Sequence, residues 1–398
     1  KYIYPYFKSD MDKGIYTRET ALELIEDFFI SFNKDSDLYP GVQQGDNGQS
    51  MVLGGRDENG REWFSELSEL CLEASRNLGL IDPKINLRVS KSTPIDEYIK
   101  GTELTRAGLG FPQYSNDDVV IDGLVSLGYA PEDAANYVVA ACWEFIIPGC
   151  AFDVVNIGAL SFPKVIDNVL HNSFSDCNDF DELMGKVRGE INAECDSITS
   201  KIHDLWFVPS PFMTVMLDSI KYRNFGIHGT GIATAADSLA AIRKYVYDEK
   251  TLTPAELIAA VDDNFVKTPE LLHKLRYDAP KMGRDDDYVD GIATSLEDMF
   301  ADSLAGRRNC EGGIFRAGTG SAMYYLWHAA EIGASPDGRR RGEPFGTNFS
   351  PSLFADTDGP VSVIKSFTKQ HLGRVINGGP LTLEFHNSVF RGDDSLSK

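Results

Sequence analysis

The sequence has few of the features that place a chain in a membrane, outside the cell or on a nucleic acid. No apolar run is long enough to cross a membrane, and the first residues, KYIYPYFKSD, do not lead into an apolar signal core. Basic residues are scarce, because 38 Lys and Arg stand against 60 Asp and Glu, a net charge of -22. Phosphate binding needs clustered Lys and Arg, so this balance argues against a nucleic-acid or anionic-membrane surface. We expect a cytoplasmic protein.

Cysteine is also sparse and shows no pattern. The 398 residues contain six cysteines, with no CxxC pair and no Cys/His grouping. This spacing argues against a disulfide framework and against a structural zinc or other metal site, and it fits a reducing compartment. The hydrophobic content of 42% is enough for a sizeable core.

Helical and strand patterns alternate along the chain, which predicts an α/β fold. Apolar residues recur at helical spacing over 18–34, after the candidate N-cap Thr17, and the run 85–89 is typical of a strand. The glycine-rich segment 226–244 lacks both the Lys-Ser/Thr ending of a Walker loop and the GxGxxG spacing. We therefore predict close backbone packing there instead of nucleotide binding.

One apolar stretch, 140–149 (AACWEFIIPG), contains a thiol and a carboxylate two residues apart. If the stretch is extended, Cys142 and Glu144 project from one face and Trp143 from the other. A carboxylate in apolar surroundings must be hydrogen-bonded, paired or protonated, and burial would raise its pKa toward the range useful for general acid–base catalysis. The alternatives are an inert core cysteine and a nucleophilic thiol, which would need a histidine such as His228 brought close by the fold.

With its flanks, this stretch resembles the cysteine loop of glycyl radical enzymes, the pyruvate formate-lyase-like superfamily, in which a small residue, Cys, any residue and Glu are followed by Pro-Gly. Further blocks resemble the family in the family's order. They cover residues 2–7, 53–57, 67–72, 87–94, 110–118, 226–241, 334–344 and 377–388.

The resemblance implies a ten-stranded α/β barrel of two five-stranded half-sheets wrapped by helices, with the loop of Cys142 at its centre. Residues 1–398 would form a single incomplete domain of this barrel. The family's radical glycine lies in an Arg-Val-x-Gly-aromatic motif. The nearest match, 374–378, has its glycine one place too late, and Gly379 follows it. We therefore expect the radical glycine outside this sequence and no activity from this piece alone.

The resemblance also implies a lyase or dehydratase mechanism. A glycyl radical takes the hydrogen of Cys142, and the thiyl radical removes a C–H hydrogen from a small polar substrate. Glu144 takes a proton beside the new carbon radical, which helps to expel a hydroxyl, amine or sulfonate. A separate iron–sulfur, S-adenosylmethionine-dependent activating enzyme installs the radical, and no other cofactor is expected. The full-length protein would form a homodimer, without nucleic-acid or membrane partners.

Six further residues are candidates for substrate contact. They are Tyr114, Ser115, Asn116, Asp153, Asn156 and His228. The first three lie where a predicted strand opens into a loop that borders the family's substrate cavity. Alternatively, Asn116 and Asp117 cap the helix that begins near residue 118. In the family's dehydratases an Asp in the region of Asp153 contacts the substrate, although the loop is shorter here than in that pattern. His228 either faces the cavity or is structural.

The motif leaves other activities open. Arylacetate decarboxylation uses the same Cys-x-Glu arrangement. Acyl transfer of the formate acetyltransferase type uses two adjacent cysteines, and Ala141 occupies the place of the first. Trp143 and Phe145 also depart from the family's usual residues, so the substrate class stays open. A hypothesis of another class is a non-catalytic barrel fragment that acts as a scaffold or split subunit.

Overall fold

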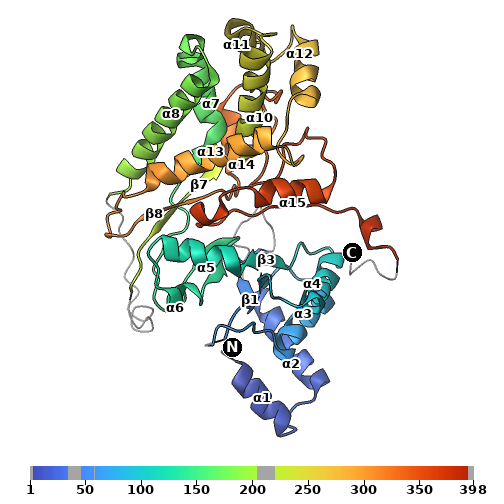
Figure 1. Ribbon diagram of the computed structural model, residues 1–398. Helices are drawn as coiled ribbons and strands as arrows, with labels where there is room; N and C mark the ends of the chain where they lie inside the picture. Colours follow the sequence, from blue (N-terminus) through green and yellow to red (C-terminus); the bar gives the residue numbers. More distant parts are fainter. Residues whose placement is uncertain (1–2, 35–45, 58, 204–219, 393–398) are drawn as a thin grey trace. The chain divides into compact units, whose positions relative to one another are not determined.

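The computed structural model describes residues 3–34, 46–57, 59–203 and 220–392 (Figure 1). The chain forms two compact units, Lys1–Pro148 with Glu384–Lys398, and Gly149–Leu383. Each contains parallel strands joined through helices, which confirms the predicted α/β class. The single barrel domain over residues 1–398 stays a prediction.

The first unit is built on a three-stranded parallel sheet of order β1-β2-β3. Its strands are β1 (Ser50–Gly54), β2 (Lys84–Val89) and β3 (Gln113–Asn116). The crossover helices are α3 (Glu66–Leu78) and α4 (Ile95–Arg106). Parallel neighbours need such crossovers, because a tight turn can join only antiparallel strands. β2 is buried along its whole length, which explains why its sequence gave the clearest strand pattern of this region.

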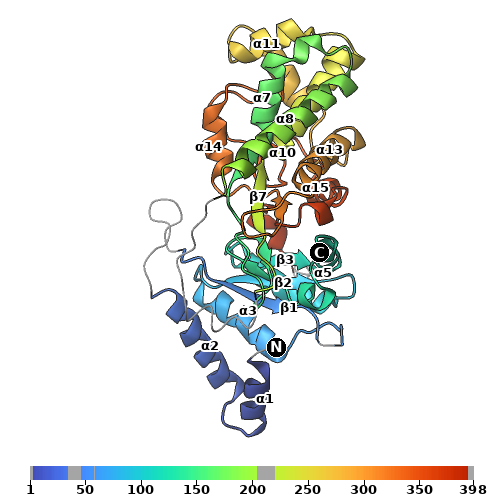
Figure 2. The ribbon, with the colours of Figure 1, turned by 90° about the vertical axis from the view of Figure 1, so that its left-hand side faces the viewer.

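Helix α2 (Arg18–Phe32) begins where the sequence predicted, because the Thr17 side chain accepts a hydrogen bond from the Thr20 N–H. Its apolar face supplies Phe29 to the core, together with Leu72 of α3 and Leu87 of β2. Figure 2 shows α2 and α3 lying side by side. The remaining elements of this unit are α1 (Tyr4–Asp12), α5 (Asp117–Ser126), α6 (Pro131–Ala134), β4 (Val138–Ala140), β5 (Glu144–Ile146) and a 3-10 turn (Asn387–Phe390).

The second unit has its own parallel sheet, of order β6-β7-β8. Its strands are β6 (Ala159–Ser161), β7 (Phe225–Thr230) and β8 (Phe315–Gly318). Figure 1 shows α7, α8, α10 and α13 gathered beside this sheet, and their apolar faces form one large core with it. The α-helices are α7 (Phe162–Asn172), α8 (Phe180–Ser200), α10 (Ile232–Ile242), α11 (Pro254–Asp262), α12 (Pro269–His273), α13 (Asp287–Leu304), α14 (Tyr324–Glu331) and α15 (Pro360–Thr368). Shorter turns are the 3-10 helices Phe174–Asp176 and Leu372–Arg374 and the π-helices Arg243–Asp248 and Lys274–Asp278.

The glycine-rich segment after residue 225 packs closely against its neighbours, as predicted. A Cβ atom on Gly226 would lie 2.2 Å from Asn377 Oδ1 and 2.3 Å from the Val155 carbonyl oxygen. Gly231 has φ +71 between β7 and α10, a backbone conformation that glycine adopts without strain.

The strands of the described residues form two three-stranded sheets and one two-stranded hairpin, and no closed barrel. Within the same ranges, no helix combines the length and the apolar character that a membrane crossing requires.

Candidate functional site

The stretch that contains Cys142 is a β-hairpin. Strands β4 and β5 pair antiparallel, with Ala140 opposite Glu144, and residues 141–143 form the turn. The stretch is therefore not extended through residues 141–143, and the condition for strand alternation to place Cys142 and Glu144 on the same face is not met. Ala141 adopts φ 49, in the left-handed region, and this reverses the chain immediately before Cys142.

The Glu144 carboxylate lies against the backbone of this turn. Its Oε2 accepts hydrogen bonds from the N–H groups of Cys142, at 3.2 Å, and Trp143, at 3.0 Å. The residue is only 4% exposed, so the turn satisfies a carboxylate that would otherwise be costly to bury. The thiol and the carboxylate are thus brought together by a turn and not by strand alternation.

The Cys142 thiol is partly buried, and burial raises its pKa to about 11, with the negative charge of Glu144 adding to the effect. The Lys84 ammonium acts in the opposite direction, and Asp46 in the same direction as Glu144. The thiol therefore keeps its hydrogen at neutral pH, unlike an activated nucleophile. The six cysteines, all among the described residues, form no disulfide bonds.

The start of β1 contacts the turn. The Ser50 hydroxyl donates a hydrogen bond of 2.9 Å to the Ala141 carbonyl oxygen. Just ahead of Ser50, the Asp82 carboxylate accepts hydrogen bonds from the N–H groups of Asn47, at 2.6 Å, and Gln49, at 3.0 Å. The hairpin is therefore hydrogen-bonded to the start of β1, whose preceding backbone is in turn hydrogen-bonded to Asp82.

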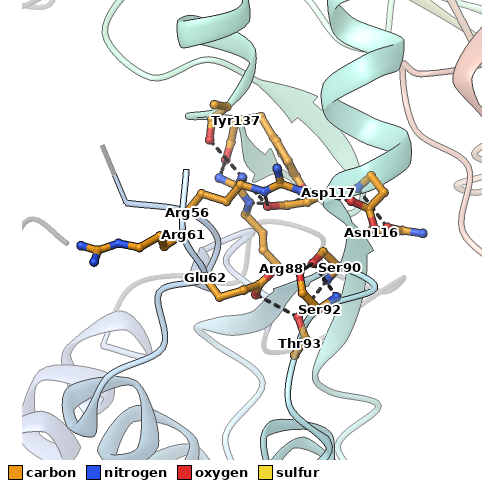
Figure 3. Close-up of polar contacts among 12 residues, drawn as sticks. Arg56, Arg61, Glu62, Arg88, Ser90, Ser92, Thr93, Asn116, Asp117 and Tyr137 are labelled. Carbon is orange, nitrogen blue, oxygen red and sulfur yellow. Dashed lines mark hydrogen bonds and ion pairs between the residues drawn. The ribbon is translucent and has the colours of Figure 1, made fainter. Parts of the chain in front are cut away.

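A buried ion pair holds the chain that enters the hairpin (Figure 3). Arg88 on β2 donates from Nε and Nη2 to the two carboxylate oxygens of Asp117, at 2.8 and 2.9 Å. Its guanidinium also donates to the carbonyl groups of Ala135, at 3.0 Å, and Tyr137, at 3.1 Å, just before β4. The Tyr137 hydroxyl donates to Asp117 at 2.7 Å, and its ring lies 4.0 Å from the Arg88 Cζ. One arginine thus links the sheet, helix α5 and the root of the hairpin.

A second group of polar side chains lies beyond the end of β2 (Figure 3). Glu62 accepts hydrogen bonds from the hydroxyl groups of Ser90 and Thr93. Arg56 donates to Asp118 at 3.1 Å. These contacts join the loops that follow β1 and β2 to the first turn of α5.

The sequence pattern did not indicate the roles of Arg88, Asp117, Tyr137 and Ser50. Arg88 and Asp117 lie inside two of the family-like blocks, and a single arginine in the apolar run INLRV was the signal that it has a buried partner. Ser50 and Tyr137 carried no comparable signal.

Tyr114, Ser115 and Asn116 lie on β3, at the opposite edge of the sheet from β1. Tyr114 is 43% exposed, and its ring stacks on Tyr98 with 5.9 Å between centroids. Ser115 is buried opposite Arg88. The Asn116 side chain accepts a hydrogen bond from the Asp118 N–H at 3.0 Å, so the capping alternative is confirmed for Asn116. Asp117 does not cap the helix but pairs with Arg88.

Asp153, Asn156 and His228 belong to the second unit. The Asp153 carboxylate accepts a hydrogen bond of 2.7 Å from the Asn224 N–H and lies 3.4 Å from the guanidinium of the buried Arg316. Asn156 accepts a hydrogen bond of 3.3 Å from a tyrosine hydroxyl on α14. His228 is completely buried on β7. Substrate contact by these three residues, and by those on β3, stays a prediction.

Known proteins resemble the chain along nearly its whole length. The (2S)-3-sulfopropanediol dehydratase of Klebsiella oxytoca is 28% identical over 439 residues, which cover 98% of this chain and 53% of that protein. The trans-4-hydroxy-L-proline dehydratase of Clostridioides difficile is 27% identical, and the match covers all of this chain and 55% of that protein. The chain thus spans about half the length of the curated relatives it matches.

A solved structure agrees with these relatives. The glycerol-bound form of the B12-independent glycerol dehydratase from Clostridium butyricum superposes with a TM-score of 0.91, at 27% identity, over 99% of this chain and 54% of that chain. The pyruvate formate lyase-like family model matches residues 1–327. The hairpin with Cys142 and Glu144 lies inside this match, and the chain belongs to the pyruvate formate lyase-like family of glycyl radical enzymes.

Proposed function

We propose that this chain supplies the thiol and the base of a glycyl radical lyase or dehydratase that eliminates a hydroxyl, amine or sulfonate from a small polar molecule. The observation that carries the proposal is the hairpin turn, where the Glu144 carboxylate is bonded to the N–H of Cys142. The names of the two dehydratases above support elimination as the class of reaction.

The properties of Cys142 suit hydrogen-atom exchange. A group that gives and recovers a hydrogen atom must carry one, and the raised pKa of the thiol keeps the S–H bond intact at neutral pH. A glycyl radical, installed outside this sequence by an iron–sulfur, S-adenosylmethionine-dependent activating enzyme, would supply the radical chemistry at this thiol. The same raised pKa disfavours a thiol hydrolase, which needs a thiolate.

Glu144 suits the role of proton acceptor. Its Oε2 is occupied by the two N–H groups of the turn, which fixes the direction of the carboxylate. The residue is only 4% exposed, so its carboxylate is shielded from water. Because the base is two residues from the thiol, both groups reach one small substrate.

Other features form part of the same proposal. We infer that the full-length protein forms a ten-stranded α/β barrel with the Cys142 loop at its centre, and that Tyr114, Ser115, Asn116, Asp153, Asn156 and His228 contact the substrate. We also infer a homodimer at full length and a cytoplasmic location, where cysteines outside disulfide bonds persist.

The test uses the protein expressed from its native reading frame and activated anaerobically. Vicinal diols, hydroxylated amino acids, hydroxysulfonates and arylacetates are offered as substrates. We expect elimination from one of the first three classes, no product with Cys142→Ser, and a loss of about 10²–10⁴-fold with Glu144→Gln. Decarboxylation of arylacetates alone would favour the decarboxylase. A native chain that ends at Lys398 and accepts no radical would favour a scaffold or split subunit.

A further inference from the structure

The turn of Cys142 is held from two sides, and one of them is Ser50. We propose that Ser50 is a positioning residue for Cys142, which it holds through the carbonyl group of Ala141. The inference rests on the proposed function of Cys142 and adds a residue 91 positions away in the sequence.

The contact lies at a residue with a strained backbone conformation. Ala141 has φ 49, which costs free energy for a residue with a Cβ atom and persists only where neighbours enforce it. The Ser50 hydroxyl holds the Ala141 carbonyl oxygen at 2.9 Å. The Glu144 carboxylate holds the next two N–H groups, those of Cys142 and Trp143. The strained residue is therefore fixed on both of its sides.

Ser50 can act as an anchor because its own position is fixed. It is the first residue of β1 and pairs with Lys84 of β2. The Lys84 ammonium forms ion pairs with Asp46 and Asp82, and these three residues are between 1% and 8% exposed. Asp82 in turn accepts hydrogen bonds from the backbone just before Ser50. A buried ionic group thus stiffens the start of the strand from which the hydroxyl reaches the turn.

Loss of the hydroxyl removes the contact of β1 with the Ala141 carbonyl group and leaves the contacts of Glu144 in place. The turn then opens more often, and the Cys142 thiol meets water more often. From the net worth of one hydrogen bond, the open population rises about 2- to 10-fold. The cysteine's reactivity reports this directly, without any radical chemistry.

The experiment compares Ser50→Thr with Ser50→Val in the full chain. The two side chains have nearly the same shape and both suit a strand, but only threonine can donate to Ala141. Iodoacetamide labelling of Cys142 is followed by peptide mass spectrometry from pH 7 to 11. We expect Ser50→Thr to label like the unmodified chain. Ser50→Val should label about 2- to 10-fold faster at pH 8, with its pH profile displaced to lower pH.

Two controls separate positioning from general loosening. Ser126→Ala removes another serine hydroxyl, which donates a hydrogen bond of 2.7 Å to the Gly123 carbonyl oxygen on α5. This substitution should leave the labelling of Cys142 unchanged. Cys71, buried on α3, serves as an internal reference. Equal Cys142 labelling in folded Ser50→Thr and Ser50→Val would overturn the proposal, as would equal acceleration of Cys71 and Cys142 in Ser50→Val. A failure of the radical activity would leave the labelling result untouched, so the two proposals fail separately.

Discussion

Replacement of Arg88 by methionine is expected to lower the free energy of unfolding of the first unit by about 3–5 kcal/mol. Arg88 is 5% exposed and Asp117 is 2% exposed, so the substitution leaves a carboxylate buried without its bidentate partner. Methionine is close in length and can fill the space beside the Tyr137 ring, so the loss comes from the polar contacts and not from a cavity.

The magnitude follows from the contacts that remain. Asp117 keeps the Tyr137 hydroxyl, at 2.7 Å, and the partly exposed Arg56, at 3.5 Å. These contacts reduce the cost of burying the Asp117 carboxylate. The carbonyl groups of Ala135 and Tyr137, however, lose the hydrogen bonds that the Arg88 guanidinium donates to them. Each buried group left without a partner costs about 1–3 kcal/mol, which keeps the total within the stated range.

Urea unfolding followed by far-ultraviolet circular dichroism measures this loss. Arg61→Met is the matched control, because the Arg61 side chain is 75% exposed in its ion pair with Asp57, and exposed ion pairs contribute little to stability. Cys142 should also label faster in Arg88→Met, since the root of its hairpin loses two hydrogen bonds. An Arg88→Met protein as stable as Arg61→Met would refute the anchoring role of this ion pair.

Three further predictions follow from buried groups. The rate of Cys142 alkylation should still rise above pH 9, because the pKa of the thiol is raised to about 11, and a rate that levels off near pH 8.5 would contradict this pKa. Glu144→Gln should increase the alkylation rate at pH 8, because it removes a negative charge that contributes to the raised pKa. Burial raises the pKa of Glu297 well above its usual range, and its Oε1 has no hydrogen-bond partner among the described residues. The folded state therefore holds a proton that the unfolded state releases above about pH 4.5, and stability falls as pH rises. Glu297→Gln should raise the free energy of unfolding at pH 8 by on the order of 1–3 kcal/mol, with a smaller gain at pH 4.5, in urea titrations at the two pH values. Gly226→Ala should cost about 1–3 kcal/mol in thermal unfolding, because its Cβ would lie 2.2 Å from Asn377 Oδ1; an unchanged midpoint would count against this packing.

Local signals in the sequence predicted local structure well. The strand over 85–89 and the helix that begins after Thr17 are confirmed, because hydrophobic period and N-cap chemistry act over a few residues. The close packing predicted for the glycines after residue 225 is also confirmed, because a Cβ atom there would collide with neighbouring atoms.

The hairpin of Cys142 shows where such reasoning stops. The sequence indicated that the thiol and the Glu144 carboxylate lie together, but residues 141–143 form a turn and not the extended segment considered for them. The turn depends on a left-handed alanine and on a side chain that folds back on its own backbone, and neither leaves a periodic pattern. Alternation of side chains applies only to an extended segment, and a tight turn interrupts it.

Partners far apart in the sequence could not be predicted. Arg88 and Asp117 are 29 residues apart, and Ser50 and Ala141 are 91 residues apart. Hydrophobic pattern shows that a charged residue is buried, but not which residue neutralises it. The structure identifies these pairs, and they connect the sheet to the catalytic hairpin of the proposed enzyme.

The most direct test of the central claim combines electron paramagnetic resonance with turnover in the activated protein from the native reading frame. In Cys142→Ser, the proposed mechanism predicts a glycyl radical signal as strong as in the unmodified protein and no detectable product. Product formation by Cys142→Ser at the unmodified rate would contradict the assignment of Cys142 as the hydrogen-exchanging residue.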